Sequence, residues 1–186
     1  AIRNAPDLTP TNFASMSMLD HNRAIAQLAE KSGVQTTEIK NVIIWGNHST
    51  TQYPDIHHAK IKGQDALSLV DDDWFINTFI PTVQQRGADV IQARGVSSAA
   101  SAANAAIKQM RAWALGTEEG DWVSMGIASD GSYGIEKGLV YSFPVISVGG
   151  EVKIVPNLKI NAFSKERMKL TETELKEERD AIKHLL

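Results

Sequence analysis

Val42-Ile43-Ile44-Trp45-Gly46-Asn47-His48-Ser49 is an apolar run that ends abruptly in small and polar residues. Its β-branched and aromatic side chains favour a strand, and the Gly-Asn pair that follows signals a turn. We therefore predict a strand over residues 41–45, with His48 presented on the loop behind it. Loops held by a rigid scaffold often contain catalytic groups, and histidine exchanges its proton near neutral pH. A purely structural role for this histidine is the alternative.

Helices are predicted on both sides of this stretch, from apolar residues that recur at three- to four-residue steps and from helix-starting residues. They cover residues 11–32, 75–93 and 97–115 and a C-terminal stretch from residue 171 onward. Gly33 stands where the first helix would be capped, and the carboxylates of residues 71–73 suit the start of the second. Thr171 with Glu174 three residues later fits a capping box, so the last helix is predicted to begin there.

Further strands are predicted at residues 123–128, 139–148 and 152–155, where apolar residues alternate or run between glycines. Gly149-Gly150 marks a tight turn, and residues 59–70 indicate a hairpin through Gly63. No repeat or low-complexity linker divides the chain. The sequence therefore predicts one α+β domain in which helices pack on a mostly antiparallel sheet.

Composition narrows the function classes. The 186 residues are 42% hydrophobic, and 19 basic and 22 acidic side chains are mixed along the chain, so we expect no nucleic-acid partner. The absence of cysteine excludes disulfides, thiolate catalysis and sulfur-based zinc sites, and it fits a cytoplasmic location. No apolar run approaches the roughly 18 residues of a membrane span, and no targeting segment is recognisable. The chain begins at Ala1 without methionine, which we interpret as a start inside a longer protein.

A carboxylate and a guanidinium share one helix face in the stretch Leu-Asp-His-Asn-Arg-Ala at residues 19–24. Asp20 and Arg23 are three positions apart, a spacing that also fits a surface ion pair worth under about 1 kcal/mol. A carboxylate bonded to one nitrogen of His48 would fix the tautomer and stabilise the cation while the other nitrogen does chemistry. Arg23 would offer a planar fork to a substrate carboxylate.

Five stretches, in this order, resemble the cytosolic malate dehydrogenase family. They are Leu-Asp-His-Asn-Arg-Ala at 19–24, Val-Ile-Ile-Trp-Gly-Asn-His-Ser at 42–49, Thr-Val-Gln-Gln-Arg-Gly at 82–87, Ser-Ser-Ala-Ala-Ser-Ala at 97–102 and Tyr-Ser-Phe-Pro-Val at 141–145. The resemblance extends over essentially the whole chain. It implies the C-terminal catalytic domain of the lactate/malate dehydrogenase superfamily, spanning residues 1–186.

The resemblance assigns roles to individual residues. His48 would be the proton acceptor and donor and would also contact the cofactor NAD, Asp20 would orient it, and Arg23 would bind the carboxylate beside the reacting carbon. The implied reaction is the reversible oxidation of malate to oxaloacetate. Gly95, Ser97 and Ser98 would border the substrate and nicotinamide; a glycine turn followed by an N-cap serine is the alternative for them.

One departure from the family is visible, because Met18 stands where an arginine usually precedes Leu-Asp. We expect this difference to affect local charge pairing or a subunit contact and to leave the three catalytic positions intact. His57-His58 could suggest a metal site, but adjacent side chains diverge and no third ligand is evident, so no metal is expected.

No Gly-x-Gly-x-x-Gly turn is present, so the N-terminal NAD-binding Rossmann domain is expected to be absent from these residues. The resemblance further implies a homodimer and a place in the tricarboxylic acid cycle. Two alternatives remain open: another 2-hydroxy-acid dehydrogenase of the lactate type, or a non-catalytic fragment that assembles with partners. The small-residue helix at 97–106 favours the second of these.

Overall fold

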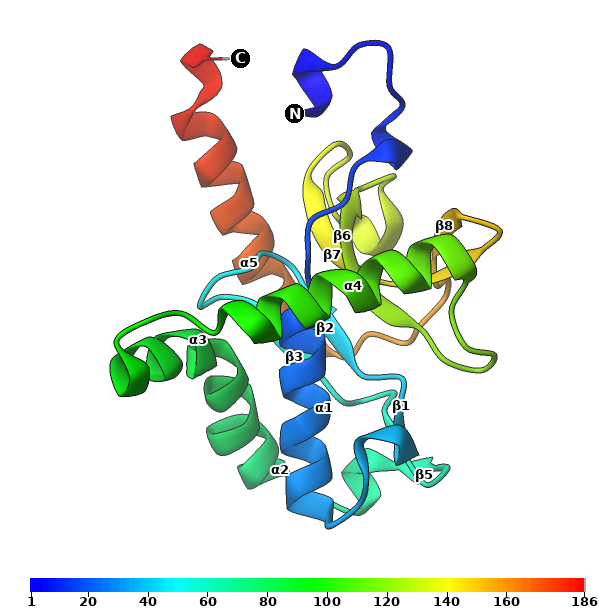
Figure 1. Ribbon diagram of the computed structural model, residues 1–186, viewed down its shortest axis with the longest axis vertical. Coiled ribbons are helices and arrows are strands. Elements are labelled where there is room, and N and C mark those ends of the chain that lie inside the picture. Colours follow the sequence, from blue (N-terminus) through cyan, green and yellow to red (C-terminus); the bar gives the residue numbers. More distant parts are fainter. Residues whose placement is uncertain (186) are drawn as a thin grey trace.

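The strand predicted at residues 41–45 forms β2, Ile43–Trp45. All three residues of β2 are buried. The computed structural model describes residues 1–185 (Figure 1). β2 pairs antiparallel with β3, Tyr53–Asp55, so the loop between them is held at both ends. The buried indole of Trp45 donates a hydrogen bond to the carboxylate of Asp55 at 2.9 Å, which satisfies both polar groups inside the core.

The other strands form two further antiparallel sheets. One contains β6 (Val123–Ala128), β7 (Val140–Val148) and β8 (Glu151–Ile154), and the other contains β1 (Ile39–Lys40), β4 (Lys60–Ile61) and β5 (Gln64–Asp65). Gly46 links β2 to β7, because its backbone exchanges hydrogen bonds of 2.9 and 3.2 Å with Ser142. The prediction of a mostly antiparallel sheet is confirmed, although the strands are divided among three sheets.

Both predicted hairpin turns are present. Lys62 and Gly63 have φ values of 51° and 80° between β4 and β5, as a two-residue turn with positive φ requires. Gly149 and Gly150 have φ values of 60° and 84° between β7 and β8. The turn chemistry of the sequence therefore locates these hairpins correctly.

Within residues 1–185, five α-helices pack against the sheets and against one another. They are α1 (Met18–Ser32), α2 (Asp72–Trp74), α3 (Ile80–Arg94), α4 (Ala99–Leu115) and α5 (Ala162–Ala181). A π-helical segment, Phe75–Phe79, joins α2 to α3 without a break. Pro81 follows it and has no N–H to continue the α-helical ladder, which explains the local widening. The helix predicted over 75–93 is thereby confirmed, with a distortion at its start.

The predicted start of the first helix at residue 11 is wrong. Pro10–Asn12 forms a separate 3-10 turn, and α1 begins only at Met18. Between them Ser15 is extended and exchanges backbone hydrogen bonds of 2.7 and 3.2 Å with Gly126 of β6. Pairing with the sheet therefore overrides the helical spacing of the apolar residues that precede α1.

The predicted start of the last helix at Thr171 is also wrong. α5 begins at Ala162, and the side chain of Asn161 caps it by accepting a hydrogen bond from the Ser164 N–H at 2.8 Å. Thr171 lies in the middle of α5 and is fully buried. Thr171 and Glu174 share a helix face at a three-residue spacing, which is the same spacing that a capping box requires.

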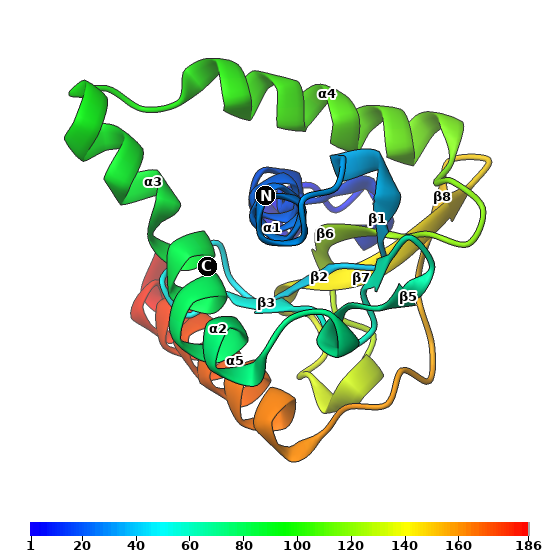
Figure 2. The same ribbon diagram turned by 90° about the horizontal axis from the view of Figure 1, so that it is seen from below.

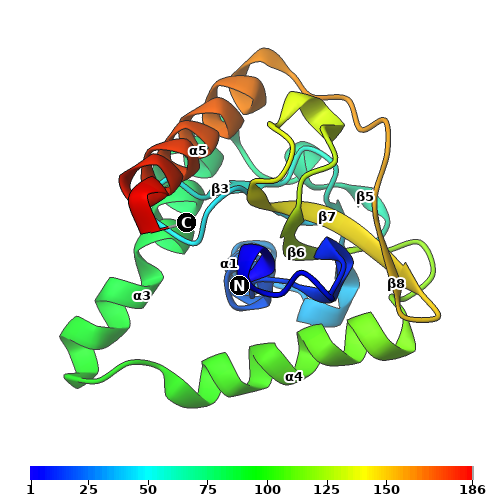
Figure 3. The ribbon, with the colours of Figure 1, turned by 90° about the horizontal axis from the view of Figure 1, so that it is seen from above.

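The layers place α1 in the middle of the molecule. Figures 2 and 3 show α1 end-on, with α4 on one side and the strands on the other, and with α5 beyond the strands. The core between these layers includes Leu28 of α1 together with Trp45, Phe79 and Phe143. α1 and α5 thus reach the loop after β2 from different sides.

Within residues 1–185 no helix is both long enough and apolar enough to cross a membrane.

Candidate active site

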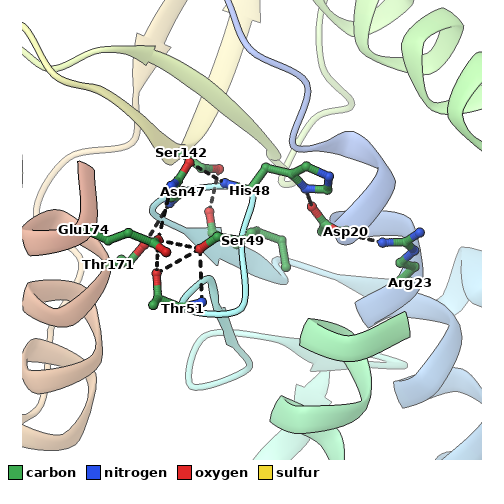
Figure 4. A network of polar contacts seen from close by, with 10 residues as sticks. Asp20, Arg23, Asn47, His48, Ser49, Thr51, Ser142, Thr171 and Glu174 are labelled. Atoms are coloured by element: carbon green, nitrogen blue, oxygen red, sulfur yellow. Dashed lines mark hydrogen bonds and ion pairs between the residues drawn. The ribbon is translucent and has the colours of Figure 1, made fainter. Parts of the chain in front are cut away.

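Asp20 and His48 meet although 28 positions separate them in the sequence. Asp20 lies in the first turn of α1 with 1% of its side chain exposed, and its carboxylate is hydrogen bonded to Nδ1 of His48. The side chain of His48 is 58% exposed on the loop after β2 (Figure 4). A buried acid therefore holds one imidazole nitrogen, while the ring reaches the molecular surface.

Arg23 binds the same carboxylate one helical turn later. Its Nη1 donates to Oδ1 of Asp20 at 2.9 Å, and its side chain is 14% exposed. The alternative of a surface ion pair is therefore wrong for these two residues. The guanidinium also lies against Gly87 of α3, where an added Cβ would be 3.7 Å from both Nη atoms. That distance is an ordinary van der Waals contact, so α3 packs against the guanidinium here without requiring a glycine.

The charges around His48 determine where its proton resides. The hydrogen bond to Asp20 raises the pKa of His48 above its usual value, while partial burial and the positive charge of Arg23 lower it by less. A carboxylate only accepts hydrogen bonds, so the proton facing Asp20 belongs to Nδ1. Nε2 is then the atom that can exchange a proton with a ligand.

Ser98 and Arg23 line a common groove of about 840 Å³ between α1 and α4. Gly95 and Ser97 do not line it and are exposed. Gly95 has a φ of 72° and caps the end of α3, as the alternative of a glycine turn predicted. Ser98 occupies the N-cap position of α4 without a side-chain capping bond. Of these three candidates, the structure brings only Ser98 into a groove with Arg23, and neither Asp20 nor His48 lines that groove.

Cations predominate in this groove, which suits an anionic ligand. Its charged lining residues are Arg23, Lys40, Arg86, Lys108, Arg111, Glu118 and Asp121. Met18, at the position where the resemblance leads one to expect arginine, also lines the groove and is 2% exposed. It packs with Leu19 and with Ala105 of α4, so an apolar contact between helices replaces a charged residue here.

His57 contacts a buried carboxylate. His57 Nδ1 is 2.7 Å from a carboxylate oxygen of Asp55, which is 1% exposed. Over residues 1–185, no group of three or more histidine, aspartate or glutamate side chains is arranged to hold a metal ion. His57 therefore belongs to the polar network that also engages Trp45 in the core.

Sequence reasoning missed two residues of α5 that contact the loop after β2. Thr171 Oγ1 accepts a hydrogen bond from the Asn47 N–H at 2.8 Å. Glu174 accepts hydrogen bonds from Ser49 and Thr51 (Figure 4). Their three-residue spacing was the available signal, since it places both on one face of a helix. Nothing local in the sequence indicated that this face meets a loop more than 120 residues earlier.

Comparison with known proteins fits this geometry. Residues 17–186 match the family described as lactate/malate dehydrogenase, alpha/beta C-terminal domain. A malate dehydrogenase from Naegleria fowleri is 50% identical, with a TM-score of 0.94 over 99% of this chain and 56% of that one. A lactate dehydrogenase from Trichomonas vaginalis, in complex with NADH and oxamate, is 38% identical, with a TM-score of 0.95 over 99% of this chain and 58% of that one.

A malate dehydrogenase from Salinibacter ruber is 22% identical, with a TM-score of 0.81 over 98% of this chain and 59% of that one, and this likeness shows the fold alone. The chain thus spans a little over half the length of the proteins that it matches. The family match covers most of the chain, and the first two structures agree with it in sequence and in fold. The chain therefore belongs to the lactate/malate dehydrogenase family, in which it corresponds to the α/β C-terminal domain.

Proposed function

We propose that this chain is the substrate-binding and proton-transferring part of an NAD-dependent malate dehydrogenase. The observation that supports this most strongly is the pair of groups on one buried carboxylate, since Asp20 engages both His48 and Arg23. An exposed imidazole and a partly exposed guanidinium are thereby fixed beside each other. This arrangement suits a substrate in which a hydroxyl group stands next to a carboxylate.

In malate oxidation, NAD supplies the acceptor for the hydride that leaves the carbon bearing the hydroxyl group. Nε2 of His48 takes the hydroxyl proton, and the carboxylate of Asp20 stabilises the imidazolium that forms. Arg23 holds the carboxylate beside the reacting carbon through its planar fork. In oxaloacetate reduction, protonated His48 returns the proton to the oxygen.

Malate is proposed over lactate because the motifs at residues 19–24 and 42–49 resemble cytosolic malate dehydrogenases. Identity to the Naegleria malate dehydrogenase, at 50%, also exceeds the 38% identity to the Trichomonas lactate dehydrogenase. That second likeness is the specific reason to keep lactate as the other candidate substrate. Both substrates place a hydroxyl group beside a carboxylate, so the proposed roles of His48 and Arg23 hold for either.

The proposal includes an N-terminal NAD-binding domain in the same protein, because the chain covers only 56% of the Naegleria malate dehydrogenase and 58% of the Trichomonas lactate dehydrogenase, the latter in complex with NADH. Ser98 is retained as a proposed substrate neighbour, since it shares the groove with Arg23. The same roles for Gly95 and Ser97 remain predictions. Homodimer formation, a cytoplasmic location and a role in the tricarboxylic acid cycle also remain predictions.

Steady-state assays on the full-length enzyme that contains this chain test the proposal. With NAD as acceptor, we expect kcat/KM for malate to exceed that for lactate by at least about a hundredfold. Equal or better turnover of lactate would assign the lactate-type activity instead. Turnover of neither substrate by folded enzyme would favour the non-catalytic alternative.

A further inference from the structure

The loop at residues 46–51, which carries His48, is held from the side opposite Asp20. Figure 4 shows α5 on one side of this loop, with Thr171 and Glu174 pointing at it, and α1 with Asp20 on the other side. The distance between imidazole and carboxylate therefore depends on two helices that are far apart in the sequence. α1 fixes the acid, and α5 contacts the loop that bears the base.

The first contact is a close approach of α5 to the loop backbone. Gly46 has a φ of +93°, and a Cβ added there would lie 2.1 Å from Cγ2 of Thr171. The next residue, Asn47, donates its backbone N–H to Oγ1 of Thr171 at 2.8 Å. The root of the loop thus packs directly on α5, with no space for a side chain between them.

The second contact is made by Glu174, whose carboxylate accepts three hydrogen bonds from the loop. Oε2 of Glu174 receives hydrogen bonds from Ser49 and Thr51 at 2.5 Å each and from Nδ2 of Asn47 at 3.1 Å. These donors lie on both sides of His48 in the loop. Although burial raises the pKa of Glu174, the three hydrogen bonds lower it below the usual value, so the group is an anion at neutral pH.

Charge-assisted hydrogen bonds are stronger than neutral ones. The ionised carboxylate of Glu174 therefore restrains the loop more than a neutral acceptor with the same three donors would. Asn47 adds a further link, because its side-chain oxygen accepts the backbone N–H of His48 at 2.9 Å. Nδ2 of Asn47 donates to Glu174 and also to Oε1 of Glu178 at 2.9 Å, so part of the restraint on His48 passes from α5 through Asn47. Arg23 and Asp20 belong to α1 and do not depend on this restraint.

We propose that Glu174 is a positioning residue that fixes the loop at residues 46–51 so that the His48 imidazole meets Asp20. The expected effect of Glu174 on the rate of malate oxidation rests on the proposed function. Its expected effect on the contact between His48 and Asp20 does not. Glu174 acts through Asn47, Ser49 and Thr51 and needs no contact with substrate.

The test compares Glu174→Leu with Glu174→Gln, which keeps a hydrogen-bond acceptor, and with the control Glu177→Gln. Glu177 is exposed on α5, and its side chain makes no hydrogen bond or ion pair within residues 1–185. In the full-length enzyme, Glu174→Leu should lower kcat for malate by about ten- to a hundredfold, because small misplacements of a catalytic group cost that much. KM should stay within about twofold, because Arg23 is unaffected. Glu174→Gln should recover most of the activity, and the control all of it.

The second readout is the pKa of His48, measured by NMR titration of the 186-residue chain and its variants. Loosening the loop weakens the hydrogen bond to Asp20, so in Glu174→Leu this pKa should fall toward the ordinary value of about 6.5. It should change little in Glu177→Gln. An unchanged pKa of His48 in Glu174→Leu overturns the proposal, even if kcat falls, because the loss would then reflect general destabilisation.

If Glu174→Leu does not fold, the double variant Ser49→Ala with Thr51→Val decides the matter from the loop side. It removes two of the three donors and leaves the glutamate in place. A lowered pKa of His48 supports the proposal, and an unchanged one overturns it. A full-length wild type that does not oxidise malate would contradict the proposed function. The pKa of His48 in the variants would still test the loop restraint, because that measurement does not depend on activity.

Discussion

Asp20 is 1% exposed, and it holds the imidazole of His48, whose side chain is 58% exposed. The pair thus joins a desolvated acid to a base that reaches the molecular surface. A carboxylate in such a position fixes one imidazole tautomer and leaves the other nitrogen available. Because Asp20 also binds Arg23, a change at Asp20 should affect both His48 and Arg23.

The pH dependence of the two reaction directions should be opposite. The raised pKa of His48 means that the imidazole is neutral only above a pH higher than the ordinary histidine value of about 6.5. Malate oxidation needs the neutral base, so its kcat/KM should rise with pH through this pKa; oxaloacetate reduction needs the cation and should fall. In Asp20→Asn the midpoint should move to lower pH. A midpoint unaffected by that substitution would contradict the pairing.

Lysine should not replace Arg23. Its ammonium group is a point charge that cannot both hold Asp20 and present a planar fork to a substrate carboxylate. We expect Arg23→Lys to reduce kcat/KM for malate by at least about 2 kcal/mol, roughly thirtyfold, because a largely desolvated charged contact is broken. Steady-state kinetics of the full-length variant provide the measurement. Kinetics like those of the wild type would mean that Arg23 pairs with Asp20 but does not bind the substrate carboxylate.

Gly46→Ala should destabilise the chain more than Gly33→Ala. Both glycines have positive φ, but a Cβ at Gly46 would lie 2.1 Å from Thr171, whereas one at Gly33 meets nothing within 4 Å. We expect about 1 kcal/mol of lost stability at Gly33 from backbone strain. About 2–5 kcal/mol is expected at Gly46, where overpacking adds to the strain. Urea unfolding of both variants measures the difference, and equal losses would argue against the tight contact with α5.

His21 should make the fold sensitive to mild acid. Burial, helped by the charge of Lys108, lowers the pKa of His21 to about 4, and its Nδ1 lies 3.0 Å from the hydroxyl group of Ser124. A lowered folded-state pKa contributes stability that is fully present above the unfolded value of about 6.5 and is lost as the pH falls toward 4. Between pH 7.5 and pH 5 the loss should be about 2 kcal/mol.

The control for this prediction is His21→Gln, whose unfolding free energy should lack that part of the pH dependence. His48 and His57 act in the opposite direction. Hydrogen bonds to Asp20 and Asp55 raise their pKa values, so their contribution is present below pH 6.5 and lost as the pH rises through the raised values. Identical pH dependence in wild type and variant would show that His21 is not buried as a neutral ring.

Local patterns in the sequence were sufficient where a short segment determines its own conformation. The hairpin at Gly63, the strand before Gly46 and the strand at residues 123–128 follow from turn residues and apolar runs. The helix starts were wrong at residue 11 and at Thr171 because distant partners decide them. Ser15 pairs with β6, and Asn161 caps a helix whose middle turn packs on the loop after β2.

The residues of the candidate site also differ in how far the local sequence predicts their roles. Asp20, Arg23 and His48 were identifiable because residue type, spacing and resemblance agreed, and the structure brings the three side chains together. The sequence predicts a capping role for Glu174, because the three-residue spacing of a capping box equals that of two neighbours on one helix face. Only the packing of α5 on the loop distinguishes the two roles, and packing between distant segments is not encoded in a local spacing.

The most direct test of the proposed chemistry is malate-dependent NADH formation by full-length enzyme in which His48 is replaced by glutamine. Glutamine keeps a polar side chain near Asp20 but cannot accept a proton near neutral pH. We predict that kcat falls by at least about a hundredfold while NADH binding, followed by fluorescence titration, stays nearly unchanged. A variant that oxidises malate at the wild-type rate would contradict the assignment of His48 as the proton acceptor.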